Sequence, residues 1–306
     1  MRAIACRVLS WLMPVLIASP AHAQGAGTAA PCETCLVEKV ARCGGFLEGA
    51  TVNRAGNLWL IDVTADRILE VGPSGECILR GKTGGLPNGA KFHRDGTLFI
   101  ADRDRGLLTF DPRTSQVSPA GITFEGKPLL GLNDLAFDSR GGLYVTVPGS
   151  FSVLNPSGRV YYIAPGKTEA TLVADRLAFP NGVAVAADDQ SLFVSEFTAK
   201  RILSLPSATS KAPIPISYVW AHTAGGIGID GLGIDSTARL YGANFGTRNV
   251  LLFSRDAEPL GAISLPPEAG NMVTNLVLSG GHLYITEAQK GEIWRVRVDA
   301  RTQHPH

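Results

Sequence analysis

The segment 179–196, FPNGVAVAADDQSLFVSE, is one copy of a unit that recurs six times along the chain. Each copy has a residue with a side-chain oxygen, an apolar alternating run, a polar turn and a second apolar run. Six such groups closed into a circle would point toward one axis, which is a way to build a metal site from oxygen ligands. The oxygen-bearing residues lie 40, 45, 48, 49 and 45 residues apart, and they are Glu48, Asn88, Asn133, Asn181, Asp230 and Asn275.

The repeat predicts strands throughout. In each unit an aligned leucine opens a β-rich run such as LWLID, a third run such as RILEV follows, and a fourth, more variable run precedes the next unit. Alternation and β-branched or aromatic residues are typical of strands. We therefore predict an all-β fold, a six-bladed β-propeller with four-stranded antiparallel blades. The alternatives, an open β-sandwich or two smaller sheets, fit the even repeat less well.

The order of the strands predicts how the ring closes. The last unit ends on a third strand at 294–298, so the segment 36–42 is expected to supply the missing fourth strand. Closure of this kind removes exposed sheet edges. The expected organisation is a signal peptide at 1–23, a cysteine-containing lead-in and closing strand at 24–44, the propeller at 45–300 and a tail at 301–306.

The N-terminus has the features of a secretory signal peptide. Arg2 and Arg7 accompany an apolar run at 8–18, and Ala21-His22-Ala23 forms a small-x-small cleavage site. The apolar run is too short to persist as a membrane span, and no other stretch is long and apolar enough to form one. We expect a mature chain from about residue 24, exported to the periplasm or secreted.

Cysteine usage agrees with export. Cys6 would leave with the signal peptide, and four cysteines would remain in an oxidising compartment, where disulfides are favoured. Three pairings are open, among Cys32, Cys35, Cys43 and Cys77.

The bulk composition narrows the class of partner. The chain has 306 residues, a net charge of +1 and an isoelectric point near 7.7, so neither nucleic acid nor an anionic membrane is indicated. We expect a small-molecule substrate, and the sequence leaves the oligomeric state open.

The same mouth of the channel should also receive the ends of the second strands. Acidic residues such as Glu196 end these strands there. Arg103 and Phe245 each follow directly after the last residue of such a second strand. Acids, one positive group and aromatic walls are what a small-molecule pocket needs. We therefore interpret Glu196, Arg103 and Phe245 as candidate substrate contacts. A surface ion pair of Arg103 with Asp102 or Asp104 is the alternative for that residue.

Four motifs, in order and at blade spacing, carry a resemblance to a known family: LEG, LND followed by AFD, FPNG, and DGLGID. From about Gly45 to Val298 the sequence resembles the SMP-30/gluconolactonase/luciferin-regenerating-enzyme group, six-bladed propellers with a divalent metal, usually calcium. The resemblance implies that Glu48, Asn181 and Asp230 are protein ligands of the metal. It implies that Asn133 is a fourth ligand or a substrate contact.

The chemistry of these four residues agrees with the resemblance. Two carboxylates neutralise a divalent cation, and two amide oxygens complete its shell without excess charge, which suits Ca²⁺. Softer metals such as Zn²⁺ would favour His or Cys, and neither occurs in the series. Zn²⁺, Mn²⁺ and Mg²⁺ are the alternatives to Ca²⁺. Asn88 and Asn275 have two alternatives, a structural role or a place in the substrate pocket.

A metal at this place favours hydrolysis of a lactone or a related ester, because it would stabilise negative charge that develops on an oxygen. Asp230 is the candidate general base or nucleophile, with Asn133 beside it. Gly131 stands where sugar-acid lactonases of the group tend to carry Arg, which favours a less polar substrate. The alternatives are an organophosphate, an isomerisation or elimination at the same site, and a non-enzymatic ligand-binding propeller with a structural calcium.

Overall fold

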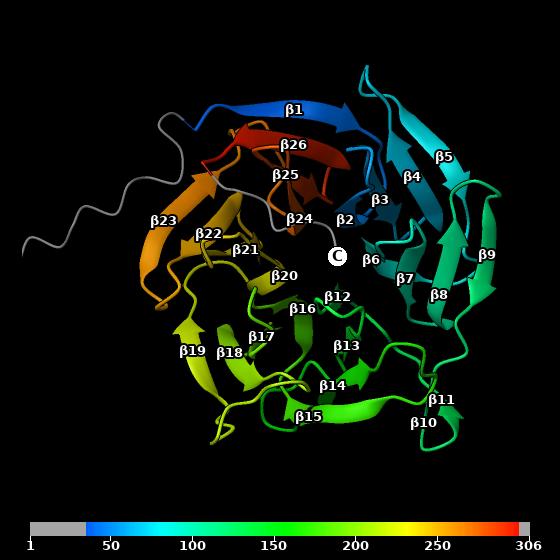
Figure 1. Cartoon of the computed structure of the whole chain (residues 1–306). Helices are drawn as coiled ribbons and strands as arrows, with labels where there is room; N and C mark the ends of the chain where they lie inside the picture. Colours follow the sequence, from blue (N-terminus) through cyan, green and yellow to red (C-terminus); the bar gives the residue numbers. More distant parts are fainter. Residues whose placement is uncertain (1–34, 300–306) are drawn as a thin grey trace, which may run out of the picture.

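The fold is a closed ring of six four-stranded antiparallel sheets around a central axis (Figure 1). The structure is a computed structural model that describes residues 35–299. Within this range every regular element is a strand, and no helix long and apolar enough to cross a membrane occurs among these residues. The predicted fold class is therefore confirmed. The expected signal peptide, most of the expected lead-in, including Cys32, and the tail lie outside the described residues.

The first three blades follow one another along the chain, from the inside of the ring outward. They are β2 (Leu47–Val52), β3 (Leu58–Asp62), β4 (Arg67–Val71) and β5 (Cys77–Gly81); β6 (Pro87–Phe92), β7 (Leu98–Asp102), β8 (Gly106–Asp111) and β9 (Gln116–Pro119); and β12 (Leu135–Phe137), β13 (Leu143–Val147), β14 (Gly158–Ile163) and β15 (Thr171–Leu177). A short hairpin, β10 (Thr123–Phe124) with β11 (Lys127–Pro128), is inserted before the third blade.

The last three blades complete the ring. They are β16 (Pro180–Val185), β17 (Ser191–Glu196), β18 (Arg201–Pro206) and β19 (Tyr218–His222); β20 (Gly228–Ile234), β21 (Leu240–Phe245), β22 (Asn249–Phe253) and β23 (Pro259–Ser264); and β24 (Val273–Ser279), β25 (His282–Glu287) and β26 (Glu292–Arg297), joined by β1 (Val37–Arg42). β1 pairs antiparallel with β26, from Val37 opposite Val296 to Arg42 opposite Glu292. The predicted closure of the ring by the N-terminal segment is confirmed.

The hydrophobic core is divided among the interfaces between blades. Six clusters of buried side chains each join two neighbouring blades. In one of them Trp59 of the first blade meets Phe92 of the second edge to face, with ring centroids 5.5 Å apart. Because each blade buries both faces against its neighbours, no blade has a complete core of its own.

The glycine that follows several of the ring residues permits this packing. A Cβ on Gly49 would lie 2.6 Å from the Asn88 carbonyl oxygen of the next inner strand, and φ at Gly49 is +57°. A Cβ on Gly182 would collide in the same way with the Asp230 carbonyl oxygen. The LEG and FPNG motifs thus contain a glycine because inner strands approach one another too closely there for a side chain.

A disulfide joins the closing strand to the first blade. Cys43, directly after β1, pairs with Cys77 at the start of β5, with 5.5 Å between their Cα atoms. This pairing ties the closing segment to the outer strand of the neighbouring sheet. The pairing of Cys32 remains a prediction, since that residue lies outside the described part of the chain.

Candidate metal centre

The six oxygen-bearing residues of the repeat lie together at one end of the central channel. Each stands within two residues of the start of an inner strand, and none is more than 8% exposed. The inner strands β2, β6, β12, β16, β20 and β24 surround the axis in Figure 1. The structure therefore places Glu48, Asn88, Asn133, Asn181, Asp230 and Asn275 in one ring, as the repeat predicts.

The backbones of three candidate ligands, Asn133, Asn181 and Asp230, are held by the preceding blade. Thr146 Oγ1 donates to the Asn181 carbonyl oxygen at 2.8 Å. Ser195 Oγ donates to the Asp230 carbonyl oxygen at 3.1 Å. The Gly89 amide donates to the Asn133 carbonyl oxygen at 2.7 Å. These bonds link consecutive blades, so the positions of the side chains depend on the neighbouring sheet.

Direct contacts join part of the ring. Asn275 Nδ2 donates to Glu48 Oε2 at 3.2 Å, and the Asn181 side chain donates to the Asp230 carboxylate. The carboxamides of Asn88 and Asn133 make no side-chain hydrogen bond within residues 35–299, which leaves their oxygens available to a ligand. Asn275 is thus placed beside Glu48, and its role in substrate binding stays a prediction.

The two carboxyl groups of the ring, on Glu48 and Asp230, have pKa values well above their usual range. Burial raises the pKa of Glu48 to about 8, with repulsion from Asp134 as the second cause. Burial also raises the pKa of Asp230 well above its usual value, and Glu48 and Asp134 add to the shift. Such buried like charges disfavour ionisation unless a positive charge compensates them. The site has the electrostatics of a cation site.

The donor set fits a hard divalent cation. Glu48, Asp134 and Asp230 are three acidic groups, and Lys91 is the one basic group among their charged partners, which leaves two negative charges when all four are ionised. No group of three or more His, Cys, Asp or Glu is arranged to hold a metal in the described range, so the candidate site depends on carboxamides as well as carboxylates. Oxygen ligands of this kind suit Ca²⁺.

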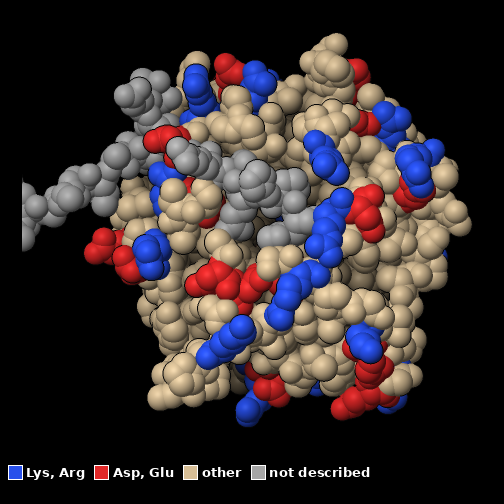
Figure 2. Space-filling model, viewed as in Figure 1, with Lys and Arg blue, Asp and Glu red and all other residues tan. Residues whose placement is uncertain are grey.

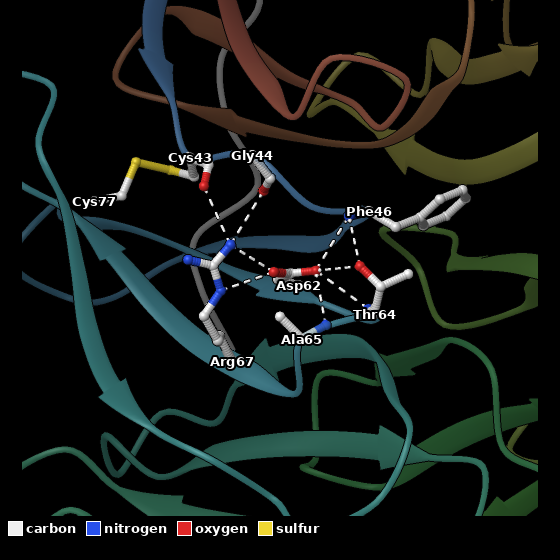
Figure 3. A network of polar contacts seen from close by, with 8 residues as sticks. All are labelled: Cys43, Gly44, Phe46, Asp62, Thr64, Ala65, Arg67 and Cys77. Carbon is white, nitrogen blue, oxygen red and sulfur yellow. Dashed lines mark hydrogen bonds and ion pairs between the residues drawn. A yellow bond between two sulfur atoms is a disulfide. The ribbon is translucent and has the colours of Figure 1, made fainter.

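The acids at the second-strand ends have a structural task that the sequence analysis missed. Asp62 accepts hydrogen bonds from the amides of Phe46 and Ala65, and from Arg67 Nε at 2.7 Å (Figure 3). Arg67 Nη2 in turn donates to the carbonyl oxygen of Cys43 at 3.1 Å. Asp62 and Arg67 thus hold in place the segment before β2 and the turn between β3 and β4.

Glu196 follows the same pattern in the fourth blade. Its Oε1 accepts the Ala178 amide at 2.7 Å, and its Oε2 pairs with Arg201. Both oxygens are engaged and the residue is 1% exposed, so its contacts are structural. Its assignment to substrate binding stays a prediction.

Arg103 does not take part in a comparable ion pair in the described part of the chain. The half-buried Arg103 side chain forms no ion pair with Asp102 or Asp104, since Asp102 accepts the amides of Leu86, Asp104 and Arg105 instead. The surface ion pair considered for Arg103 is therefore absent among the described residues.

Phe245 belongs to a row of aromatic rings beside the ring of ligands. Its centroid is 5.9 Å from that of Phe197, which is 5.8 Å from that of Phe179. Phe151, 64% exposed, stacks on Phe179 at 3.9 Å. The side of the channel that carries the candidate metal centre therefore has an apolar, partly exposed rim.

The sequence as a whole matches a family model described as the SMP-30/gluconolactonase/LRE-like region, over residues 46–303. The chain belongs to this family. Among curated proteins, lactonase drp35 of Staphylococcus aureus (strain MW2) is 30% identical over 238 residues, which are 74% of this chain and 72% of the relative. Lactonase drp35 of Staphylococcus haemolyticus is 31% identical over 230 residues, 72% of this chain and 70% of the relative.

Solved structures show the same fold as this SMP-30/gluconolactonase-like chain. A gluconolactonase from Xanthomonas campestris superposes with a TM-score of 0.77 at 21% identity, over 89% of this chain and 93% of that one. A calcium-binding protein, regucalcin, from Agrobacterium tumefaciens superposes with a TM-score of 0.75 at 19% identity, over 88% and 96%. The resemblance drawn from the four motifs is confirmed at the level of family and fold.

Two charged residues of this family member were missed by the sequence analysis. Asp134 stands where four of the repeats carry glycine, and Lys91, three residues after Asn88, is the charged residue at a position that is otherwise uncharged in the repeat. Lys91 Nζ donates to the Ala50 carbonyl oxygen at 3.3 Å. Its charge counteracts those of Glu48 and Asp134. A search for repeat positions at which a single copy carries a charged residue would have found Asp134 and Lys91.

Proposed function

We propose that the protein is a calcium-dependent hydrolase of the lactonase type. The observation that carries the proposal is the buried ring in which Glu48 and Asp230 share one channel end with Asn133 and Asn181. The curated relatives named as lactonases support the reaction class, and the structural likeness to a calcium-binding regucalcin supports the metal. In this proposal Glu48, Asn133, Asn181 and Asp230 hold the cation.

The proposed chemistry divides between the cation and the chain. A bound divalent cation would polarise the carbonyl oxygen of the lactone and stabilise the negative charge that develops there. Asp230 would take a proton from the attacking water as the water oxygen bonds to the carbonyl carbon, and it would return that proton to the alkoxide oxygen released when the ring C–O bond breaks. The cation would also lower the pKa of Asp230, so that the carboxylate is ionised at neutral pH. Asn133, whose side-chain carboxamide is not hydrogen-bonded within the described residues, would orient the substrate.

The surroundings favour a substrate that is less polar than a sugar-acid lactone. Gly131 leaves space beside Val147, whose Cγ1 would be 3.5 Å from a Cβ at that position. The aromatic rim that contains Phe245, Phe197 and Phe151 supplies apolar contact area on the same side of the channel. Arg103 and Asn88 are the polar groups that we propose for substrate contact.

The compartment is part of the proposal. The signal sequence expected at 1–23 would export the chain to the periplasm or out of the cell, where the Cys43–Cys77 disulfide is stable. Intact-mass analysis of the exported protein tests this, because cleavage near Ala23 removes Met1 and Cys6 together.

A panel of substrates tests the reaction. Sugar-acid lactones, less polar lactones, aryl esters and organophosphates should be assayed with the purified protein before and after EDTA, and again after addition of Ca²⁺. We expect hydrolysis of less polar lactones that EDTA abolishes and Ca²⁺ restores. Full activity in metal-free protein would refute the metal mechanism, and turnover of organophosphates alone would replace the lactonase assignment.

A further inference from the structure

A cavity of about 320 Å³ lies at the end of the channel opposite the candidate metal centre. Its walls form where the inner strands end, and each of the six strands contributes an apolar side chain. These side chains are Val52, Phe92, Phe137, Val185, Ile234 and Leu278. Pockets for small molecules typically measure ~300–1,000 Å³, so this cavity suits a small ligand with an apolar body.

This cavity is separate from the candidate metal centre. None of the six ring residues lines it, and Lys91 is the residue that the two places share. Lys91 reaches the Ala50 carbonyl oxygen and interacts with Glu48 and Asp134, so its charge is directed toward the carboxylates. The cavity therefore has apolar walls. The positive charge of Lys91 at its floor is balanced by the carboxylates of Glu48 and Asp134.

Three arginines stand at one position of the repeat on this side of the ring. They follow the first three inner strands, in the turns NRAG, HRDG and SRGG, and they are Arg54, Arg94 and Arg140. All three are exposed. Arg54 lines the cavity, and Arg94 Nη2 would lie 3.7 Å from a Cβ on Gly141 in the next turn. On the face drawn in Figure 2, Lys and Arg side chains form a broken row beside the centre of the ring.

The acids in the turns on this side do not neutralise these arginines. Asp95 pairs with His93, with 3.0 Å between Oδ2 and Nδ1. Asp138 is buried and accepts hydrogen bonds within its own blade. Asp188 and Asp189 accept hydrogen bonds from Gln190 and Ser139. By contrast, the side chains of the three arginines form no hydrogen bond to an acid and no ion pair within residues 35–299.

We propose that this cavity binds a small amphipathic anion, such as a carboxylate with a medium-length alkyl chain. The alkyl chain would lie among the apolar strand ends, and the carboxylate would meet Arg54 at the opening. Neither part of the argument depends on the lactonase activity, because the cavity and the candidate metal centre lie at opposite ends of the inner strands.

Calorimetric titration of the full protein with octanoate tests the proposal, with 1-octanol as the neutral probe of the same chain length. We expect one octanoate per protein, with weaker binding of the alcohol. Leu278→Asp places a charge in the wall and should abolish measurable binding. Arg54→Glu replaces attraction by repulsion at the surface and should weaken octanoate by about fivefold, without a matching loss for octanol.

Matched controls separate this site from others. Leu79→Asp and Arg113→Glu change an exposed leucine and an exposed arginine outside the cavity and should leave binding unchanged. Phe151→Ala tests the aromatic rim on the other side. Binding that EDTA abolishes, or that Phe151→Ala reduces while Leu278→Asp does not, would overturn the proposal. So would octanoate that fails to bind, or that binds equally to the wild type and the Arg54→Glu variant.

Discussion

Removal of the Cys43–Cys77 disulfide should destabilise the protein while leaving the candidate metal centre intact. The bridge closes a segment of 34 residues. Chain entropy alone makes such a loop worth about 3.8 kcal/mol at 25 °C, since the entropy lost by the unfolded chain grows with the logarithm of loop length. For a domain of this size, about 2–4 °C of melting temperature accompany each kcal/mol, so a decrease of about 8–15 °C is expected.

Thermal unfolding of the Cys43→Ser/Cys77→Ser double variant, followed by circular dichroism, gives the measurement. Calcium binding at 25 °C should remain within about twofold of the wild type, because the bridge lies on the outer side of β1 and the first blade. Any further loss of stability that reductant causes in the double variant reports on the remaining cysteines. A melting temperature within about 2 °C of the wild type would refute the reasoning, as would loss of calcium binding in a folded variant.

Other perturbations probe the channel directly. Asp230→Asn should lower kcat by at least about 100-fold with the fold intact, as expected when a general base is removed; unchanged kcat would exclude Asp230 from the chemistry. Glu48→Gln should act through metal affinity, so that excess Ca²⁺ restores activity in a titration. Lys91→Met should tighten Ca²⁺ by about tenfold or more, because one positive charge even ~10 Å from another costs over 1 kcal/mol at an effective dielectric constant of 20; weaker Ca²⁺ binding by calorimetry would contradict this. Burial raises the pKa of Glu48 from 4.5 to about 8 in the metal-free protein. Because the folded state then binds more protons than the unfolded state, the metal-free protein should lose stability as pH rises from about 4.5 to 8. Saturating Ca²⁺ should remove this dependence, and melting curves at several pH values check both expectations.

The repeat contained most of the information needed to predict the fold. Strand alternation and a constant spacing predicted the blades, and the missing fourth strand predicted the pairing of β1 with β26. The β10–β11 hairpin was not predicted, because it is an insertion in one blade with no counterpart in the others. The partner of Cys43 could not be derived, since proximity of β1 and β5 appears only after the ring is closed.

The sequence predicted some residues of the candidate site and missed others. A shared register placed Glu48 and Asp230 in one ring, because side chains at the same position of each blade face the same end of the axis. The same reasoning did not predict the contacts of Glu196 with Ala178 and Arg201, since register gives the height of a carboxylate but not which neighbours its oxygens meet. Asp134 and Lys91 were overlooked because they depart from the repeat, and a search for shared positions does not detect departures.

The pairing of β1 with β26 also constrains the order of events during synthesis. β1 leaves the ribosome before every other described strand, yet its partner is the last of them. Asn275 contacts Glu48, and Thr274 Oγ1 donates to the Leu47 carbonyl oxygen at 2.6 Å, so the environment of Glu48 is also completed by the sixth blade. A chain whose sixth blade is not yet in place therefore cannot form the complete ring, and in the proposed function the metal would be acquired only after that blade has formed. An early Cys43–Cys77 crosslink would keep the waiting strand beside the first blade during that interval.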